Sequence, residues 1–153
     1  MSILALIGWI LLSFAAAAVG GSAAGPGAWY ASINKPSWNP PNWVFGPVWT
    51  ALYLLMGVSA WLVWSRRGQV PVGIALTLFV IQLMLNALWS WLFFGWQMPG
   101  AALIEILALW VMILLTLLAF WQIRPLAGKL LLPYLAWVSF ATVLNAALVM
   151  KNS

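Results

Sequence analysis

Long apolar stretches alternate with short polar breaks along the whole chain. Five of them are long enough, as helices, to cross about 30 Å of hydrocarbon. They are apolar on all sides, so periodicity cannot assign their type, but length can, since strands of a membrane barrel would alternate and be about ten residues long. The predicted spans are residues 3–24, 44–64, 70–94, 100–121 and 130–150.

This pattern predicts an all-α integral membrane protein, a bundle of five transmembrane helices in one domain over residues 1–153. Basic residues, glycines and prolines mark the breaks, as in Arg66-Arg67-Gly68 and Arg124-Pro125. The odd number of spans argues against two equal inverted halves.

The loop between the first two spans, residues 25–43, cannot form a continuous helix. Pro36, Pro40 and Pro41, with Pro47 soon after, remove backbone donors and push Lys35 and Asn39 away from the helical region. The segment is also rich in tryptophan. A stiff aromatic loop of this kind predicts a lid over the bundle rather than a simple connector.

Composition narrows the chemistry. The chain is 66% hydrophobic and 5% charged, and it contains no cysteine and no histidine. Disulfides, thiolate chemistry and imidazole metal ligands are therefore excluded, and we expect no metal site. The single acidic residue, Glu105, gives no acid–base pair and no proton relay. The phosphate-cradling glycine motifs of nucleotide-driven transporters are absent.

The net charge of +5 comes from only six basic residues. They are scattered singly or in one pair, not along a face, so we expect membrane-flanking anchors and no nucleic-acid partner. Four of them (Arg66, Arg67, Arg124, Lys129) lie on the side that holds the N-terminus, against Lys35 and Lys151 on the other. By the positive-inside rule the N-terminus is cytoplasmic and the lid outside, in a bacterial cell membrane.

The first span is rich in small residues but lacks a basic leader and exceeds the usual apolar length of a signal peptide, so we do not expect cleavage. Two rows of small residues spaced four apart predict close packing against another helix instead: Ala16, Gly20 and Ala24, and likewise Ala17, Gly21 and Gly25.

Polar and aromatic side chains recur at a similar depth in four spans. At 1.5 Å per residue, five of them lie within about 12 Å of the lid-side boundary: Trp49, Asn86, Ser90, Glu105 and Asn145. Trp137 lies about 20 Å deep, on one helix face with Ala141 and Asn145. Because polar groups are costly in hydrocarbon, they should face each other or a ligand. We expect a cavity beneath the lid, floored by Trp137.

Simpler interpretations stay open. One alternative is that Asn86 and Asn145 hydrogen-bond a neighbouring helix and do not contact a ligand. For Glu105 we favour a place in the first helical turn, where the helix dipole stabilises a carboxylate, or a partner in Lys35, over a catalytic role. Tryptophans near span ends are typical of the interface belt: Trp61, Trp64, Trp89, Trp91, Trp96 and Trp121.

Three ordered segments resemble a known family. They are the loop and second span with Trp-Asn-Pro-Pro-Asn-Trp at its centre (residues 29–49), Gln82 to Gly95, and Pro133 to Asn145. Together they resemble the translocator protein / tryptophan-rich sensory protein family, formerly called the peripheral-type benzodiazepine receptor. The resemblance covers essentially the whole chain.

The resemblance implies five transmembrane helices, a first loop capping a pocket, homodimers, and binding of porphyrins such as protoporphyrin IX. Synthetic isoquinoline carboxamides and benzodiazepines use the same pocket in the family. No cofactor is implied beyond porphyrin as a ligand. The implied ligand-binding positions are Tyr30, Pro40, Pro41, Trp49, Tyr53, Asn86, Trp89, Ser90, Trp137, Ala141 and Asn145.

Two departures from the family matter. Animal members resemble a cholesterol motif near the C-terminus, but its tyrosine position is Ala146 here, which argues against sterol recognition. Family members can dimerise through small residues on the third span, and residues 74–85 of this chain keep only Ala75. A homodimer is expected without a named interface.

Three function classes follow. A receptor or sensor that binds tetrapyrroles leads, and the lack of histidine and cysteine favours ring stacking over iron ligation, so metal-free porphyrin fits at least as well as haem. Transport of tetrapyrroles or sterols is second. Light-dependent porphyrin breakdown is third, with Trp49 and Trp137 as the redox-capable pair.

Overall fold

The computed structural model describes residues 2–21 and 28–152, and every regular element within these ranges is helical. In chain order the elements are α1 (Ile3–Gly21), α2 (Ala28–Ser32), α3 (Asn42–Trp64), α4 (Gly73–Ser90), the π-helix η1 (Trp91–Gly95), α5 (Pro99–Ile123), α6 (Pro125–Leu130) and α7 (Leu132–Lys151).

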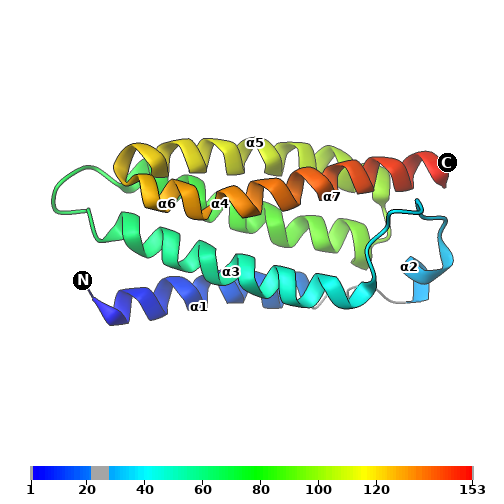
Figure 1. The fold of residues 1–153 in the computed structure, drawn as a ribbon, viewed down its shortest axis with the longest axis horizontal. Coiled ribbons are helices and arrows are strands. Elements are labelled where there is room, and N and C mark those ends of the chain that lie inside the picture. The colour runs from blue at the N-terminus through cyan, green and yellow to red at the C-terminus, as the bar shows by residue number, and fades with distance from the viewer. Residues whose placement is uncertain (1, 22–27, 153) are drawn as a thin grey trace.

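The long helices lie side by side in one bundle (Figure 1). Within the described residues, five helical segments are long and apolar enough to cross a membrane, with α4–η1 and α6–α7 each forming one of them. The N-terminus and the connection at residues 65–72 lie at one end, and α2 and the C-terminus lie at the other (Figure 1). The predicted five-span architecture is confirmed.

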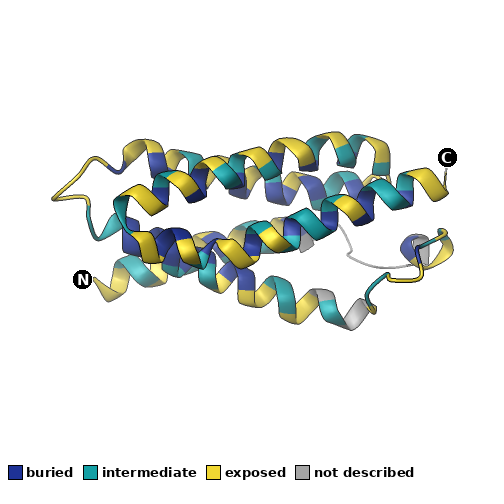
Figure 2. Cartoon of the chain, turned by 45° about the horizontal axis from the view of Figure 1, so that its top comes forward, coloured by how far each residue is buried: buried dark blue, intermediate teal, exposed yellow. Residues whose placement is uncertain are grey.

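The outer faces of the helices are apolar. Large side chains such as Ile74, Ile104 and Leu107 are mostly exposed, Ile104 to 73%. Exposed positions run along the outside of the helices and buried positions face inward (Figure 2). An exposed surface with so few charges is unsuited to water, and hydrocarbon is its natural solvent.

Some boundaries differ from those predicted. The first span was expected to reach residue 24, whereas α1 ends at Gly21 and residues 22–27 lie outside the described part of the chain. The predicted loop contains the short helix α2, and α3 already begins at Asn42. The fifth span is interrupted at Leu131, and Pro133 lies in the first turn of α7, where its missing N–H is not needed.

The third span changes its helical pitch near the lid. The Trp96 N–H donates to the Trp91 carbonyl at 2.7 Å, and Gln97 then takes a positive φ of 56°. A π-helical turn shifts the side chains that follow it relative to an ideal α-helix. Here it directs Phe93 and Phe94 toward the lid residue Tyr30.

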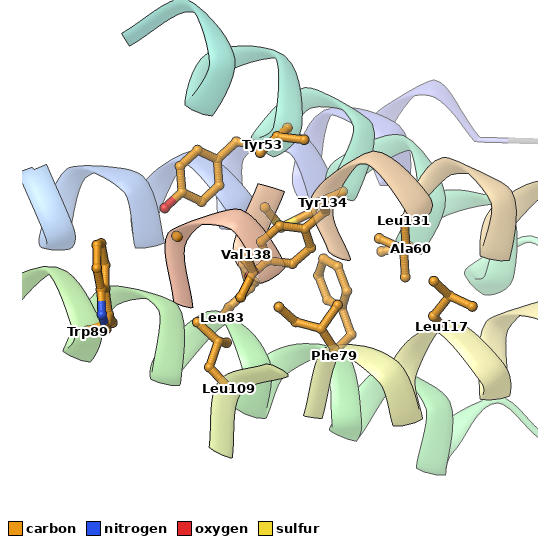
Figure 3. Packing of buried hydrophobic residues seen from close by; sticks show 14 of the residues in the cluster. Tyr53, Ala60, Phe79, Leu83, Trp89, Leu109, Leu117, Leu131, Tyr134 and Val138 are labelled. Carbon is orange, nitrogen blue, oxygen red and sulfur yellow. The ribbon is translucent and has the colours of Figure 1, made fainter. Parts of the chain in front are cut away.

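Backbone contact sets the distance between α1 and α3. A Cβ built on Gly57 would lie 2.7 Å from the Ile10 Cα, so only glycine allows this approach. Elsewhere the core is filled by apolar side chains from α3, α4, α5 and α7 (Figure 3). For example, the rings of Phe79 and Phe120 stack with centroids 5.8 Å apart.

Hydrogen bonds hold the lid loop in a defined shape. The Lys35 ammonium group donates to the carbonyls of Tyr30, Ala31 and Ile33, at 2.8, 3.3 and 3.1 Å. Tyr30 and Ala31 belong to α2, whose last carbonyls lack partners within so short a helix, and Ile33 directly follows it. The Tyr30 hydroxyl donates to the Asn39 side chain at 2.8 Å and closes the loop on itself.

One side chain fastens the lid to the bundle. The Asn152 amide accepts from the Asn34 N–H at 2.9 Å and donates to the Asn34 carbonyl at 2.8 Å. It also donates to the Leu148 carbonyl in the last turn of α7. Asn152 thus pairs with the loop much as a neighbouring strand would, and we call this pair of residues the latch.

The close approach at Gly57 gives a first prediction. Gly57→Ala should lower the stability of the protein by about 1–3 kcal/mol, because the new methyl group collides with the α1 backbone. Thermal unfolding in detergent measures the change. Gly8→Ala is the matched control, since no described atom lies within 4 Å of its Cβ position; alanine there should be neutral or stabilising. Equal midpoints for the two variants would contradict the close packing.

The latch gives a second prediction. Asn152→Ala removes both hydrogen bonds to Asn34, each worth about 0.5–1.5 kcal/mol. The Asn34 amide should therefore exchange its hydrogen with solvent faster than in the parent chain, as mass spectrometry can measure. Lys151→Ala, one residue earlier and exposed, should leave that rate unchanged. If the Asn34 amide exchanges its hydrogen at the same rate in both variants, Asn152 does not hold the lid.

Candidate ligand-binding site

A cavity of about 340 Å³ lies beneath α2, between the lid-side halves of α1, α3, α4–η1 and α7. This volume falls within the range of small-molecule sites, about 300–1,000 Å³. Its walls are formed by Phe14, Ala17, Gly20, Tyr30, Gly46, Trp49, Thr50, Tyr53, Trp89, Ser90, Phe93, Phe94, Trp137, Phe140, Ala141, Leu144 and Asn145.

Most of the positions implied by the family resemblance lie on this wall: Tyr30, Trp49, Tyr53, Trp89, Ser90, Trp137, Ala141 and Asn145. Pro40, Pro41 and Asn86 are not among the described residues that line it. Whether each of the eleven contacts a ligand stays a prediction. Trp89 is only 9% exposed and faces the cavity, so its assignment to the interface belt was wrong.

Aromatic rings from two helices, α3 and α7, form one side of the cavity. The Trp49 ring meets the Trp137 ring edge to face, with centroids 6.3 Å apart, and lies against Tyr53 at 5.7 Å. On α7, Phe140 continues the wall at 5.4 Å from Trp137. Flat faces and edges of this kind favour a planar ligand. Trp137 is thus part of a side wall shared with Trp49.

The roof is formed by Tyr30 of α2. Its side chain is almost fully buried and packs on Phe94 and Phe93, with centroids 5.6 and 6.1 Å away. Burial raises the pKa of the Tyr30 phenol, although the hydrogen bond to Asn39 opposes this shift. The group is therefore neutral at physiological pH. Trp38, further along the loop, packs edge to face on Phe140.

A hydrogen-bond chain runs beneath the cavity. The Tyr53 hydroxyl donates to Asn86, whose amide donates to the Tyr134 hydroxyl at 2.8 Å. Tyr134 in turn donates to Gln82 at 2.7 Å, and Gln82 donates to the sulfur of Met56 at 3.9 Å. Tyr53 and Tyr134 come from α3 and α7, and both rings are drawn in Figure 3. Asn86 therefore joins three helices below the cavity.

Two further hydrogen bonds connect the part of the cavity wall formed by Trp89 and Asn145 to the start of α5. The Trp89 indole N–H donates to Asn145 at 3.0 Å, and the Asn145 amide donates to the Pro99 carbonyl at the start of α5 at 2.9 Å. Asn145 lines the cavity, yet both ends of its amide already have partners within the protein. A ligand would therefore meet mainly apolar and aromatic surface.

The structure contradicts both interpretations of Glu105 that the sequence favoured. It lies beyond the first turn of α5, which contains no acidic residue, so the helix-dipole explanation is wrong. Lys35 donates to carbonyls of the loop instead. The carboxylate oxygens are buried, with no hydrogen-bond partner among the described residues, and Glu105 is not among those that line the cavity.

Two parts of the wall were not expected from the sequence. Phe14 and Ala17 of α1 line the cavity, and Gly20 lies so close to Ser90 that a Cβ would be 3.2 Å from its hydroxyl oxygen. The rows of small residues in α1 predicted a close approach but not a cavity; Ala24 and Gly25 lie outside the described residues. Phe93 and Phe94 depend on the π-helical turn, for which the sequence carries no signal.

The site is suited to binding rather than to acid–base chemistry. No group of three or more His, Cys, Asp or Glu side chains that could hold a metal ion occurs in the described ranges. The hydroxyls of Tyr30 and Tyr53 both donate hydrogen bonds to asparagines. The cavity offers shape and ring faces.

Comparison with known proteins agrees with this architecture. Residues 9–150 match the TspO/MBR family. The chain is 48% identical to tryptophan-rich protein TspO of Chlorobaculum tepidum over 131 residues, which cover 83% of this chain and 82% of that protein. It is 46% identical to human translocator protein over 76% of this chain and 70% of that one. With the tryptophan-rich sensory protein of Cereibacter sphaeroides the identity is 42% over 90% and 88% of the two chains. The chain therefore belongs to the TspO/MBR family of multi-pass membrane proteins.

Proposed function

We propose that this protein is a membrane receptor that binds a metal-free porphyrin, of the protoporphyrin IX type, in the cavity beneath the lid. The observation that carries the proposal is the aromatic wall, where Trp49, Trp137 and Phe140 present ring faces and edges to one space. A flat conjugated macrocycle is the ligand chemistry that such a wall recognises best.

The polar groups of the site support a metal-free ring. Haem iron is held by His, Cys, Met or Tyr ligands, and this chain has no histidine or cysteine. The two tyrosines on the wall, Tyr30 and Tyr53, donate their hydroxyls to Asn39 and Asn86. Coordinating a metal through either oxygen would disturb the lid or the hydrogen-bond chain below the cavity.

The same tryptophans favour one second candidate, light-dependent breakdown of the bound porphyrin. Trp49 and Trp137 both line the cavity and their rings are in contact, so each would lie beside an excited macrocycle. Loss of the porphyrin absorbance band under illumination, with no loss in the dark, would favour breakdown. Porphyrin absorbance that is stable both in the light and in the dark would exclude breakdown and leave the receptor function.

The wall gives a third prediction. Trp137→Leu should weaken protoporphyrin IX binding by about 1–2 kcal/mol, because it removes an aromatic face from the ligand. Trp49→Leu should behave similarly. Titration of the purified protein, followed by quenching of tryptophan fluorescence, gives the dissociation constants.

Trp61→Leu is the matched control. Trp61 is also a half-buried tryptophan of α3, but its indole N–H donates to the Ser2 carbonyl at the opposite end of the bundle. Its loss should leave the affinity nearly unchanged. If Trp61 and Trp137 substitutions weaken binding equally, the porphyrin does not lie against this wall.

A further inference from the structure

The helices α3 and α7 enclose a seam that opens toward the lid. At the far end the Ser59 hydroxyl of α3 donates to the Ala127 carbonyl of α6 at 2.7 Å, and both residues are fully buried. Toward the lid, α3 and α7 diverge, which both views show (Figures 1 and 2). The cavity lies in this widening part, because residues of both helices line it.

Aromatic side chains, rather than backbone packing, fill the seam. Trp49 of α3 and Trp137 of α7 meet across it edge to face, and both are half-buried. Trp38 of the loop covers Phe140 at the lid end. A ring can change rotamer without moving a helix, whereas backbone packing between two helices can open only if a helix moves.

The α3 side of the seam faces outward and presents little polarity. Gly46 and Thr50 line the cavity and are exposed on the outside of the bundle. The Thr50 hydroxyl donates back to the Gly46 carbonyl at 2.8 Å, so it is satisfied within its own helix. Both residues belong to the membrane-spanning segment of α3. The seam therefore borders the hydrocarbon of the bilayer, and the Thr50 hydroxyl at its edge needs no hydrogen-bond partner from outside the helix.

The route through the lid is more firmly closed. Opening it would separate the latch, with its two hydrogen bonds between Asn34 and Asn152. It would also remove the buried Tyr30 ring from Phe93 and Phe94. Opening the seam displaces ring contacts such as that between Trp49 and Trp137, in a solvent that favours apolar groups.

We propose that the ligand enters and leaves the cavity sideways from the bilayer, between α3 and α7, with Trp49 and Trp137 as the gate. This inference rests on the proposed function and adds the source of the ligand, a planar macrocycle taken up from the membrane. The lid then stays closed while the ligand passes between α3 and α7.

The first test locks the roof. In the chain, which has no cysteine of its own, Asn34→Cys with Asn152→Cys allows a short bis-maleimide to join the lid to α7. The rate at which protoporphyrin IX quenches tryptophan fluorescence is measured in lipid nanodiscs by stopped flow. Locking should change the association rate by no more than about twofold, whereas a fall on the order of tenfold would overturn the proposal.

The second test narrows the seam. Thr50→Trp should slow association and dissociation together, each on the order of tenfold, since a gate affects both directions. Thr77→Trp is the matched control: Thr77 is also exposed and donates to a glycine carbonyl one turn earlier, Gly73, but it lies on α4 away from the described cavity lining. Its rates should stay within about twofold of the parent.

The outcomes separate the two proposals. Unchanged rates in Thr50→Trp, or a change in the dissociation rate with no change in the association rate, would overturn the seam as the entrance while leaving the receptor intact. Failure of the parent protein to bind protoporphyrin IX saturably would overturn the proposed function, and the entrance with it.

Discussion

The hydrogen-bond chain from Tyr53 through Asn86 and Tyr134 to Gln82 is the constraint on which the cavity depends. In a bundle surrounded by hydrocarbon, water is not available to satisfy a buried hydroxyl or amide, so each must find its partner within the protein, in its own helix or in another. These four side chains do so across α3, α4 and α7, and all of them are buried. The three helices are thereby fixed relative to each other immediately below the empty space.

Satisfied polar groups also determine what the cavity can recognise. Asn145 and Trp89 bond to each other and to the start of α5, while the Tyr30 hydroxyl belongs to the lid. What remains for a ligand is ring surface and shape. Such a site discriminates by planarity and size more than by individual hydrogen bonds, which agrees with a membrane-soluble aromatic ligand.

The sequence sufficed for the spans, the irregular loop and the depth of the special residues. Length alone predicts the spans, and prolines predict the loop, because both effects are local. The sequence did not suffice to predict toward which neighbouring helix or cavity each side chain faces. Helices that are apolar all round give no period from which to align them, so Asn86 could equally face the cavity or a tyrosine below it. Glu105 was expected to pair with Lys35, which donates to carbonyls of the loop instead, because a helix that is apolar all round does not show which neighbour its one carboxylate faces. The π-helical turn that redirects Phe93 and Phe94 leaves no mark in the composition of η1.

A crystal structure of the complex with protoporphyrin IX would show whether the ligand lies in the cavity beneath α2. We expect the macrocycle in van der Waals contact, within about 4.5 Å, with the rings of Trp49 and Trp137. A second apolar groove lies outside the bundle between α1 and α4, lined by residues such as Leu12, Met84 and Trp91. A macrocycle found in that groove, with the cavity beneath the lid empty, would contradict the account.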